Sequence, residues 1–352
     1  MNTIILRCLI AVIVFFTVWG CKTMDKSRSP ESALGTDASE VDYSLIYVIH
    51  GDGNYLYHDQ EGKRLQADQQ QLEEAISVAR QAKQGEVFIF HQQPEERFLW
   101  LFPKKDRRFL YFKNGKHIKS KKYSPENNQR HFEKEAAFYH QFRSSTTSKS
   151  VFLYYGHEIP SRKYKGYFQS RPQVNFDIEH FSAGLGLFLE DNGKFDLTVL
   201  STCDNGTPKV VSALQGKTEY LLASPENLHL SHIDSGGLLQ LEQPDNSIAE
   251  ISRTIAEETY DRLTNFLQTV VTITIYDMDG IQSTAEHLLT GYQRYSAGQA
   301  DLSVEQENTD CATLPFWDDD SGNWEGVEVL FKAPAFGPQA NRVTHSGWGC
   351  QL

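Results

Sequence analysis

Two short apolar segments of this chain each lead to a side chain that can take part in covalent catalysis. Residues 195–201 are typical of a buried strand, which runs into Cys203 and an Asn-Gly turn. Residues 150–155 form an earlier apolar segment, which is followed by His157. Because parallel strands of an open α/β sheet present their carboxyl ends at one edge, we expect the thiol and the imidazole to lie together there. A cysteine nucleophile needs such a base, since the thiolate and not the thiol attacks.

The N-terminal residues indicate export and a lipid anchor. Residues 1–20 combine one early positive charge with an apolar run too short for a comfortable membrane span, which predicts a signal peptide. A small residue just before Cys21 resembles the bacterial lipoprotein box, which implies cleavage there and lipidation of Cys21. Lys22 stands where an aspartate would favour inner-membrane retention, so we expect the outer membrane of the cell envelope. An ordinary signal peptide and an uncleaved anchor are the alternatives.

The remaining composition limits the partners and the pairing of the cysteines. Residues 21–42 are polar and predict a flexible tether. The net charge of −12 disfavours nucleic acid as a partner. Exported cysteines tend to pair, and Cys311 with Cys350 in the C-terminal tail is the natural disulfide. Cys203 is then left over, and a buried structural role is the alternative to catalysis.

The order of predicted elements indicates an α/β fold with a mostly parallel sheet flanked by helices, over residues 43–297. No glycine-rich phosphate loop is present, and no cofactor is expected. Residues 98–123 predict a basic β-meander inserted at the sheet edge, with nine Lys or Arg between Lys104 and Lys122. A charged edge that blocks strand pairing is its simplest role, and substrate docking or proteolytic processing are alternatives. The amino-acid composition changes in residues 298–352, where Gly, Pro, Trp and acidic residues are prominent, and this change predicts a small C-terminal appendage closed by the disulfide.

Around the two predicted site strands, the chain resembles the clostripain-like cysteine peptidases, which are relatives of caspases, gingipains and legumains. The resemblance rests on Tyr154-Tyr155-Gly156-His157, on Cys203-Asp204-Asn205-Gly206 and on the segment 220–226, Tyr-Leu-Leu-Ala-Ser-Pro-Glu. It implies a caspase-like fold and hydrolysis of peptide bonds in peptide or protein substrates by a Cys–His dyad. In that dyad Cys203 would attack the scissile carbonyl and His157 would act as acid and base. The backbone N–H of Cys203 and one near His157, at Glu158, would hold the oxyanion.

Three departures from the family pattern bear on specificity and activity. Glu158 replaces the usual glycine after the histidine, where it can crowd the oxyanion site and raise the histidine pKa. Ser201 replaces the aspartate that selects Arg or Lys in the S1 pocket, so that preference is not carried over. The segment after His157 is also longer and more basic than the family pattern. The expected substrate-binding residues are Ser201, Asp204, Ser224 and Glu226.

One alternative function of the same fold remains open, and two other kinds of site, a lipase oxyanion loop and a metal site, have weaker support. A catalytically inactive protein of the same fold, acting as an envelope-binding or adhesion lipoprotein, is the main alternative. His50-Gly51-Asp52-Gly53 is similar to a lipase oxyanion loop, but the chain has no G-x-S-x-G nucleophile motif. His229, His232 and Asp234 are too loosely arranged to predict a metal site. We expect those two histidines to line the substrate cleft or to be solvated.

Overall fold

The computed structural model describes most of the chain from residue 40 onward. The described ranges are 40–51, 55–93, 97–98, 102–103, 106–124, 131–161, 164–165, 175–191, 193–230, 232–267, 269–297, 308–317, 325–337 and 339–351. The predicted signal peptide, Cys21 and nearly all of the predicted tether lie outside these ranges. Among the described residues, no helix is both long and apolar enough to cross a bilayer.

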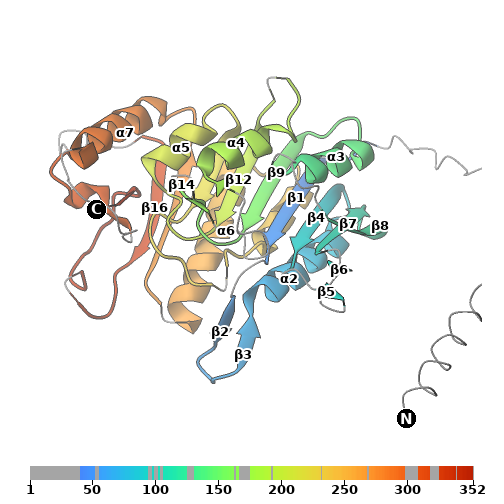
Figure 1. Cartoon of the computed structure of the whole chain (residues 1–352), viewed down its shortest axis with the longest axis horizontal. Helices are drawn as coiled ribbons and strands as arrows, with labels where there is room; N and C mark the ends of the chain where they lie inside the picture. The colour runs from blue at the N-terminus through green and yellow to red at the C-terminus, as the bar shows by residue number, and fades with distance from the viewer. Residues whose placement is uncertain are drawn as a thin grey trace, which may run out of the picture. The chain divides into compact units, whose positions relative to one another are not determined.

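Among the described residues, a nine-stranded mixed sheet that is parallel at its centre forms the middle of the fold (Figure 1), which confirms the predicted α/β class with a mostly parallel sheet. Five neighbouring strands run parallel in the order β4-β1-β9-β12-β13, and antiparallel strands β7 and β8 extend one edge while β14 and β16 extend the other. The bounds are β1 Tyr43–His50, β4 Gly85–Gln92, β7 Arg107–Lys113, β8 Lys116–Tyr123, β9 Lys149–Tyr155, β12 Phe195–Ser201, β13 Thr218–Ala223, β14 Val271–Asp277 and β16 Val327–Lys332.

Helices cover both faces of the sheet because alternate residues of each buried strand point to opposite sides. In β1, Ile46 and Val48 join one apolar core, whereas Leu45, Tyr47 and Ile49 join the other. The first core includes residues of four helices: α3 Glu133–Phe142, α4 Ile178–Gly186, α5 Pro208–Leu214 and α7 Gln282–Ala297. The second includes α2 Ala67–Gln81, the 3₁₀ helix η1 Gly236–Glu242 and α6 Ile248–Asp261, which continues as the π-helical turn η2 Arg262–Phe266.

The predicted basic meander contributes two strands to the main sheet. Strands β7 and β8 are joined by Asn114-Gly115, and both turn residues have positive φ angles, as this type of hairpin requires. Seven of the eight residues of β8 are exposed, and four of them are lysines. A strand that presents so many positive charges at a sheet edge disfavours pairing with another chain.

In the part of the chain that the structure describes, four two-stranded ribbons accompany the main sheet. They are β2 Leu56–His58 with β3 Arg64–Gln66, β5 Arg97–Phe98 with β6 Phe102–Pro103, β10 Tyr164–Lys165 with β11 Asn175–Phe176, and β15 Asn308–Asp310 with β17 Gly349–Gln351. The last ribbon carries the disulfide between Cys311 and Cys350. The C-terminal residues thus form two structures: β16 in the main sheet and a disulfide-linked ribbon.

Candidate active site

The register of two central strands brings the predicted catalytic residues to one edge of the sheet. Strands β9 and β12 are parallel neighbours with five paired positions, the last of which is Tyr155 with Ser201. The pairing continues for one residue, since the Gly156 N–H donates to the Ser201 carbonyl oxygen at 3.4 Å. His157 and Cys203 each follow two residues after the last pair, so both lie beyond the same carboxyl-terminal edge.

The thiol of Cys203 is half-buried and oriented by the backbone of Leu228. The Leu228 N–H donates to Sγ at 3.3 Å, and the S–H donates to the Leu228 carbonyl oxygen at 3.2 Å. The first contact stabilises a thiolate, whereas the second holds the thiol proton. The sulfur is therefore fixed in position without being sealed inside the core.

His157 is held by Tyr55, a residue that the sequence interpretation missed. The two rings stack with centroids 4.6 Å apart, and the His157 backbone N–H donates to the Tyr55 hydroxyl oxygen at 3.1 Å. His157 is exposed as a whole residue, but Tyr55 covers one face of its ring, and burial lowers the pKa of the imidazole below the usual 6.5. The ring is therefore mostly neutral at pH 7, the form that can accept a proton.

A buried amide, Asn205, joins the turn after β9 to the turn after β12. Its Oδ1 accepts from the Ile159 N–H at 2.9 Å and from the Thr202 hydroxyl at 2.6 Å, and its Nδ2 donates to the Ile159 carbonyl at 3.0 Å. The side chain is 1% exposed. The sequence pattern had identified Asn205 only as part of an Asn-Gly turn. In the structure it fixes the residues that follow His157 against those that follow Cys203.

The other predicted site residues lie around the same edge, mostly with internal partners. Glu158 is half-exposed beside His157. Ser201 is 2% exposed, and its hydroxyl accepts the Ile233 N–H at 2.7 Å. Asp204 has a left-handed φ of 54°. The buried Ser224 hydroxyl donates to the Glu226 carbonyl at 2.7 Å, which shapes the turn after β13.

The Glu226 carboxylate is engaged by the C-terminal segment. Its Oε1 lies 3.3 Å from His345 Nε2 and 3.6 Å from Arg342, and its Oε2 accepts the Thr272 hydroxyl at 3.1 Å. Burial favours the neutral acid, but the hydrogen bond and charge of His345, with Thr272 and Arg342, outweigh it and lower the Glu226 pKa. The negative charge predicted for substrate binding is thus balanced inside the molecule.

Of the two predicted loop histidines, His232 lines an open cleft, and His229 packs against a residue of the cleft lining. His229 follows Leu228 and packs edge-on against Tyr57, whose ring lies 4.9 Å away. Tyr57 and His232 both line a cleft of about 630 Å³. His232, Glu74 and Asp234 lie close enough to hold a metal ion. However, His232 bonds Glu74 at 2.6 Å and Arg262 bonds both oxygens of Asp234 at 2.8 Å, so both carboxylates already have a partner within the protein.

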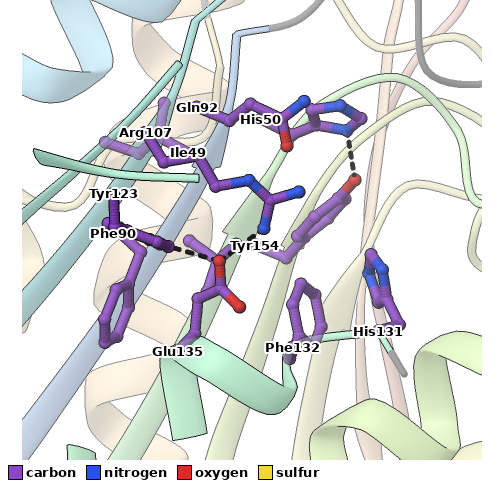
Figure 2. A pocket seen from close by; sticks show the side chains of 11 residues that line it. Ile49, His50, Phe90, Gln92, Arg107, Tyr123, His131, Phe132, Glu135 and Tyr154 are labelled. Carbon is purple, nitrogen blue, oxygen red and sulfur yellow. Dashed lines mark hydrogen bonds and ion pairs between the residues drawn. The ribbon is translucent and has the colours of Figure 1, made fainter. Parts of the chain in front are cut away.

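A second polar cluster lies at the ends of β1 and β4, on the opposite face of the sheet (Figure 2). His50 Nδ1 is 3.0 Å from the Tyr154 hydroxyl, and Arg107 pairs with Glu135. Burial, followed by the charges of Arg107 and His157, keeps the pKa of His50 well below its usual value. His50 is therefore part of a small buried polar cluster that also holds the Arg107–Glu135 pair, whereas Asp52 and Gly53 of its sequence motif lie outside the described residues.

Solved structures share this fold. No protein-family model and no curated protein sequence matches the chain. An inactive zymogen C11 protease from Parabacteroides distasonis has a TM-score of 0.58 at 13% identity, over 88% of this chain and 91% of its own. A secreted C11 cysteine protease from Bacteroides thetaiotaomicron, in complex with an irreversible peptide inhibitor, has a TM-score of 0.56 at 12% identity, over 88% and 89%. The chain has the fold of the clostripain-like, or C11, cysteine proteases.

Proposed function

We propose that this protein is an exported cysteine endopeptidase in which Cys203 is the nucleophile and His157 is the acid and base. The observation that carries the proposal is the register of β9 and β12, which sets both residues two positions beyond the same pair of strand residues. The half-exposed sulfur and the neutral imidazole support it. The likeness to C11 proteases shows the fold and makes a peptide substrate the natural choice.

The reaction would follow from these groups without a cofactor. The His157 imidazole takes the thiol proton, and the Cys203 thiolate attacks the scissile carbonyl carbon. The backbone N–H groups of Cys203 and Glu158 are proposed to stabilise the oxyanion, and one such donor is worth about 10² to 10³ in rate. The imidazolium then protonates the leaving amine, and water hydrolyses the acyl-enzyme.

The cleft beside His229 is the proposed path of the substrate. It is lined by Phe266, several carboxylates and Tyr57, and Tyr57 contacts His229, the residue after Leu228, whose backbone orients the thiol. Ser201 lies where the family has its S1 aspartate, so we propose no Arg or Lys preference at that subsite. In this proposal Asp204 remains a candidate contact at the cleft, whereas Ser201, Ser224 and Glu226 shape the backbone around it.

Alkylation of the thiol tests the proposal directly. Mass spectrometry after iodoacetamide treatment at pH 7 should show Cys203 labelled much faster than a cysteine in an unfolded peptide. The His157→Ala variant should slow that labelling, and both Cys203→Ala and His157→Ala should abolish hydrolysis of fluorescein-labelled casein. Labelling of Cys203 at the rate of the unfolded peptide would refute the enzyme assignment.

One observation favours the inactive alternative. The hydrogen bond from the S–H to the Leu228 carbonyl favours the protonated thiol over the thiolate that attacks. An envelope-binding protein would use the exposed lysines of β8 instead. Binding to isolated envelopes that is lost at high salt but kept in Cys203→Ala, together with slow labelling, would establish that function.

The anchoring at Cys21 is a separate part of the proposal. It rests on the export-type N-terminus and the lipoprotein-like sequence before Cys21. Expression of wild type and Cys21→Ser in a bacterial host, followed by fractionation, tests it. Wild type should remain with the outer membrane, whereas Cys21→Ser should appear in the soluble fraction. Equal distribution of the two proteins would refute lipid anchoring.

A further inference from the structure

The turn that carries the thiol is held from one side by residues more than 100 positions further along the chain. This nucleophile turn, residues 203–206, has four backbone groups with identified partners at Asp204 and Gly206. Two of them are bound by the turn after β13: the Asp204 N–H donates to the Glu226 carbonyl at 3.1 Å, and the Gly206 N–H donates to the Ser224 carbonyl at 2.8 Å. The other two are bound by the disulfide-linked ribbon.

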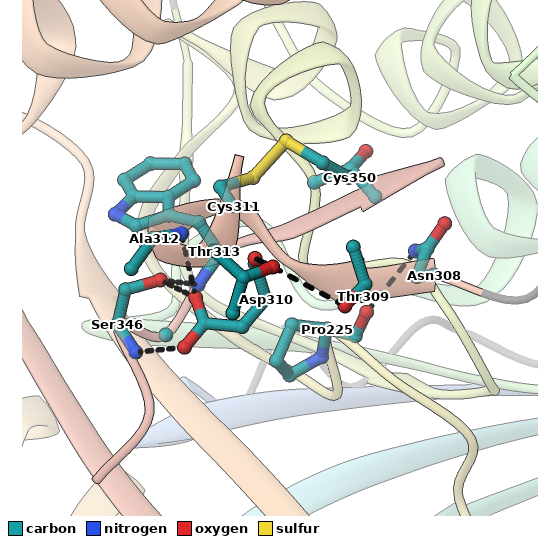
Figure 3. The surroundings of a disulfide bond; sticks show 12 residues. Pro225, Asn308, Thr309, Asp310, Cys311, Ala312, Thr313, Ser346 and Cys350 are labelled. Atoms are coloured by element: carbon teal, nitrogen blue, oxygen red, sulfur yellow. Dashed lines mark hydrogen bonds between the residues drawn. A yellow bond between two sulfur atoms is a disulfide. The ribbon is translucent and has the colours of Figure 1, made fainter. Parts of the chain in front are cut away.

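Asn308 of β15 binds both the nucleophile turn and the turn after β13, and Figure 3 shows its contact with Pro225 of the second turn. Its Nδ2 donates to the Asp204 carbonyl at 3.1 Å and to the Pro225 carbonyl at 3.0 Å. A primary amide has two N–H donors, so one side chain satisfies both oxygens. The turn containing Pro225 leads to Leu228, the residue that orients the sulfur. Asn308 therefore connects the segment that carries the thiol to the segment that orients it.

The partner strand β17 contributes the second contact. The Gly349 N–H donates to the Gly206 carbonyl at 2.9 Å. A Cβ atom on Gly349 would lie 2.0 Å from the Pro225 carbonyl oxygen, so this approach is open only to glycine. The fully buried Trp348 packs on Tyr276 with ring centroids 5.0 Å apart, which secures the ribbon to β14 of the main sheet.

The ribbon supports a backbone conformation that is not favourable by itself. Asp204 adopts φ 54°, a region that non-glycine residues enter at a cost, and such residues persist where their surroundings hold them. The disulfide joins Cys311, the residue after β15, to Cys350 of β17, and within the ribbon Thr309 pairs with Cys350 and Asn308 with Gln351. The disulfide thus keeps Asn308 and Gly349 on one unit.

We propose that the disulfide-linked ribbon is a clamp that sets the reactivity of the Cys203 thiol, with Asn308 as its positioning residue. This inference rests on the proposed function for its effect on catalysis, but not for its effect on the turn itself. Asn308 touches no reacting atom and acts through the Asp204 and Pro225 carbonyls. Its removal should lower the rate of the chemical step while leaving substrate binding nearly unchanged.

The test compares three variants of the whole protein with wild type. Asn308→Asp keeps the size of the side chain but loses both donors, and Thr309→Ala is the matched control on the same strand. The Cys311→Ser/Cys350→Ser double variant removes the disulfide without a thiol reductant, which would itself consume iodoacetamide. Three quantities are measured below the unfolding temperature of each variant. They are hydrogen exchange in the peptides covering residues 201–214 and 224–230, the kinetics of casein hydrolysis, and the rate of iodoacetamide labelling from pH 5 to 9.

The clamp predicts a specific pattern of results. In Asn308→Asp and in the double variant, backbone amides of both peptides should exchange faster. Both kcat and the labelling rate should fall about tenfold, which corresponds to the loss of one net hydrogen bond. KM should stay within about twofold of the wild-type value. Thr309→Ala should behave as wild type. Unchanged exchange and labelling in Asn308→Asp would overturn the clamp even if wild type is a peptidase. Slow labelling of wild type with faster exchange in Asn308→Asp would instead refute the proposed function and retain the clamp.

Discussion

Replacing Asn205 by alanine should disturb the candidate site more than any exposed substitution, because this amide joins its two halves. The change removes three hydrogen bonds at a position that is 1% exposed. The Ile159 N–H and carbonyl and the Thr202 hydroxyl then lose a partner inside the protein. An unsatisfied buried polar group costs about 1–3 kcal/mol. Partial access of water to the vacated space reduces the sum, so we expect the free energy of unfolding to fall by about 2–4 kcal/mol.

Urea denaturation followed by far-UV circular dichroism measures that loss, and iodoacetamide labelling of Cys203 measures its effect on the site. We expect labelling to slow by at least about tenfold, since the turn after His157 is released from the turn after Cys203. Asn205→Asp is the matched variant, because it keeps the acceptor but loses the donor to Ile159. A loss of stability below about 1 kcal/mol with unchanged labelling in both variants would refute the joining role.

Three further predictions concern pKa values and buried charge. Tyr55→Ala uncovers one face of His157, whose pKa is lowered by burial. The pH below which labelling of the thiol slows should therefore rise toward 6.5, and an unchanged pH would show that Tyr55 does not set the pKa of His157. The lowered pKa of Glu226 means that its stabilising contribution is present above about pH 4.5, its unfolded value, and is lost as pH falls through the lower folded value. The difference in unfolding free energy between wild type and Glu226→Gln should therefore shrink between pH 6 and pH 3, and a constant difference would contradict it. Glu135→Gln leaves the charge of Arg107 without its partner in a site where both side chains are mostly buried, and chemical denaturation should show a loss of about 3–5 kcal/mol; a loss below 1 kcal/mol would mean that water already screens the pair.

The parts of the site that were predictable from sequence are those encoded locally. An apolar strand followed by Cys203, and another followed by His157, are visible within a few residues each, and the parallel sheet follows from the alternation of strands and helices. The partners of these residues are not encoded locally. Tyr55 lies 102 residues before His157 in the chain, and Asn205 is 46 residues from Ile159. An Asn-Gly pair has a sufficient explanation as a turn, so nothing in its surroundings indicates that the amide also joins two strands.

The C-terminal residues are a second example of long-range contacts that the local sequence does not indicate. Their composition indicated a separate appendage, and the positions of Cys311 and Cys350 suggested that they pair, as they do in the structure. Nothing in the spacing of Asn308 or Gly349 indicated contact with the turn at Cys203. The main-sheet strand β16 was also not predicted, because its membership depends on pairing with β14 across the 49 residues between the two strands. Tertiary pairing of this kind overrides local pattern.

The five paired positions between β9 and β12 have a consequence for breaks in the chain. The hydrogen bonds between these strands hold positions 157 and 203 together. The covalent segment that connects the two strands is not needed for this. A proteolytic nick anywhere in the connection would therefore yield two fragments that stay associated, each bringing one half of the same reactive pair.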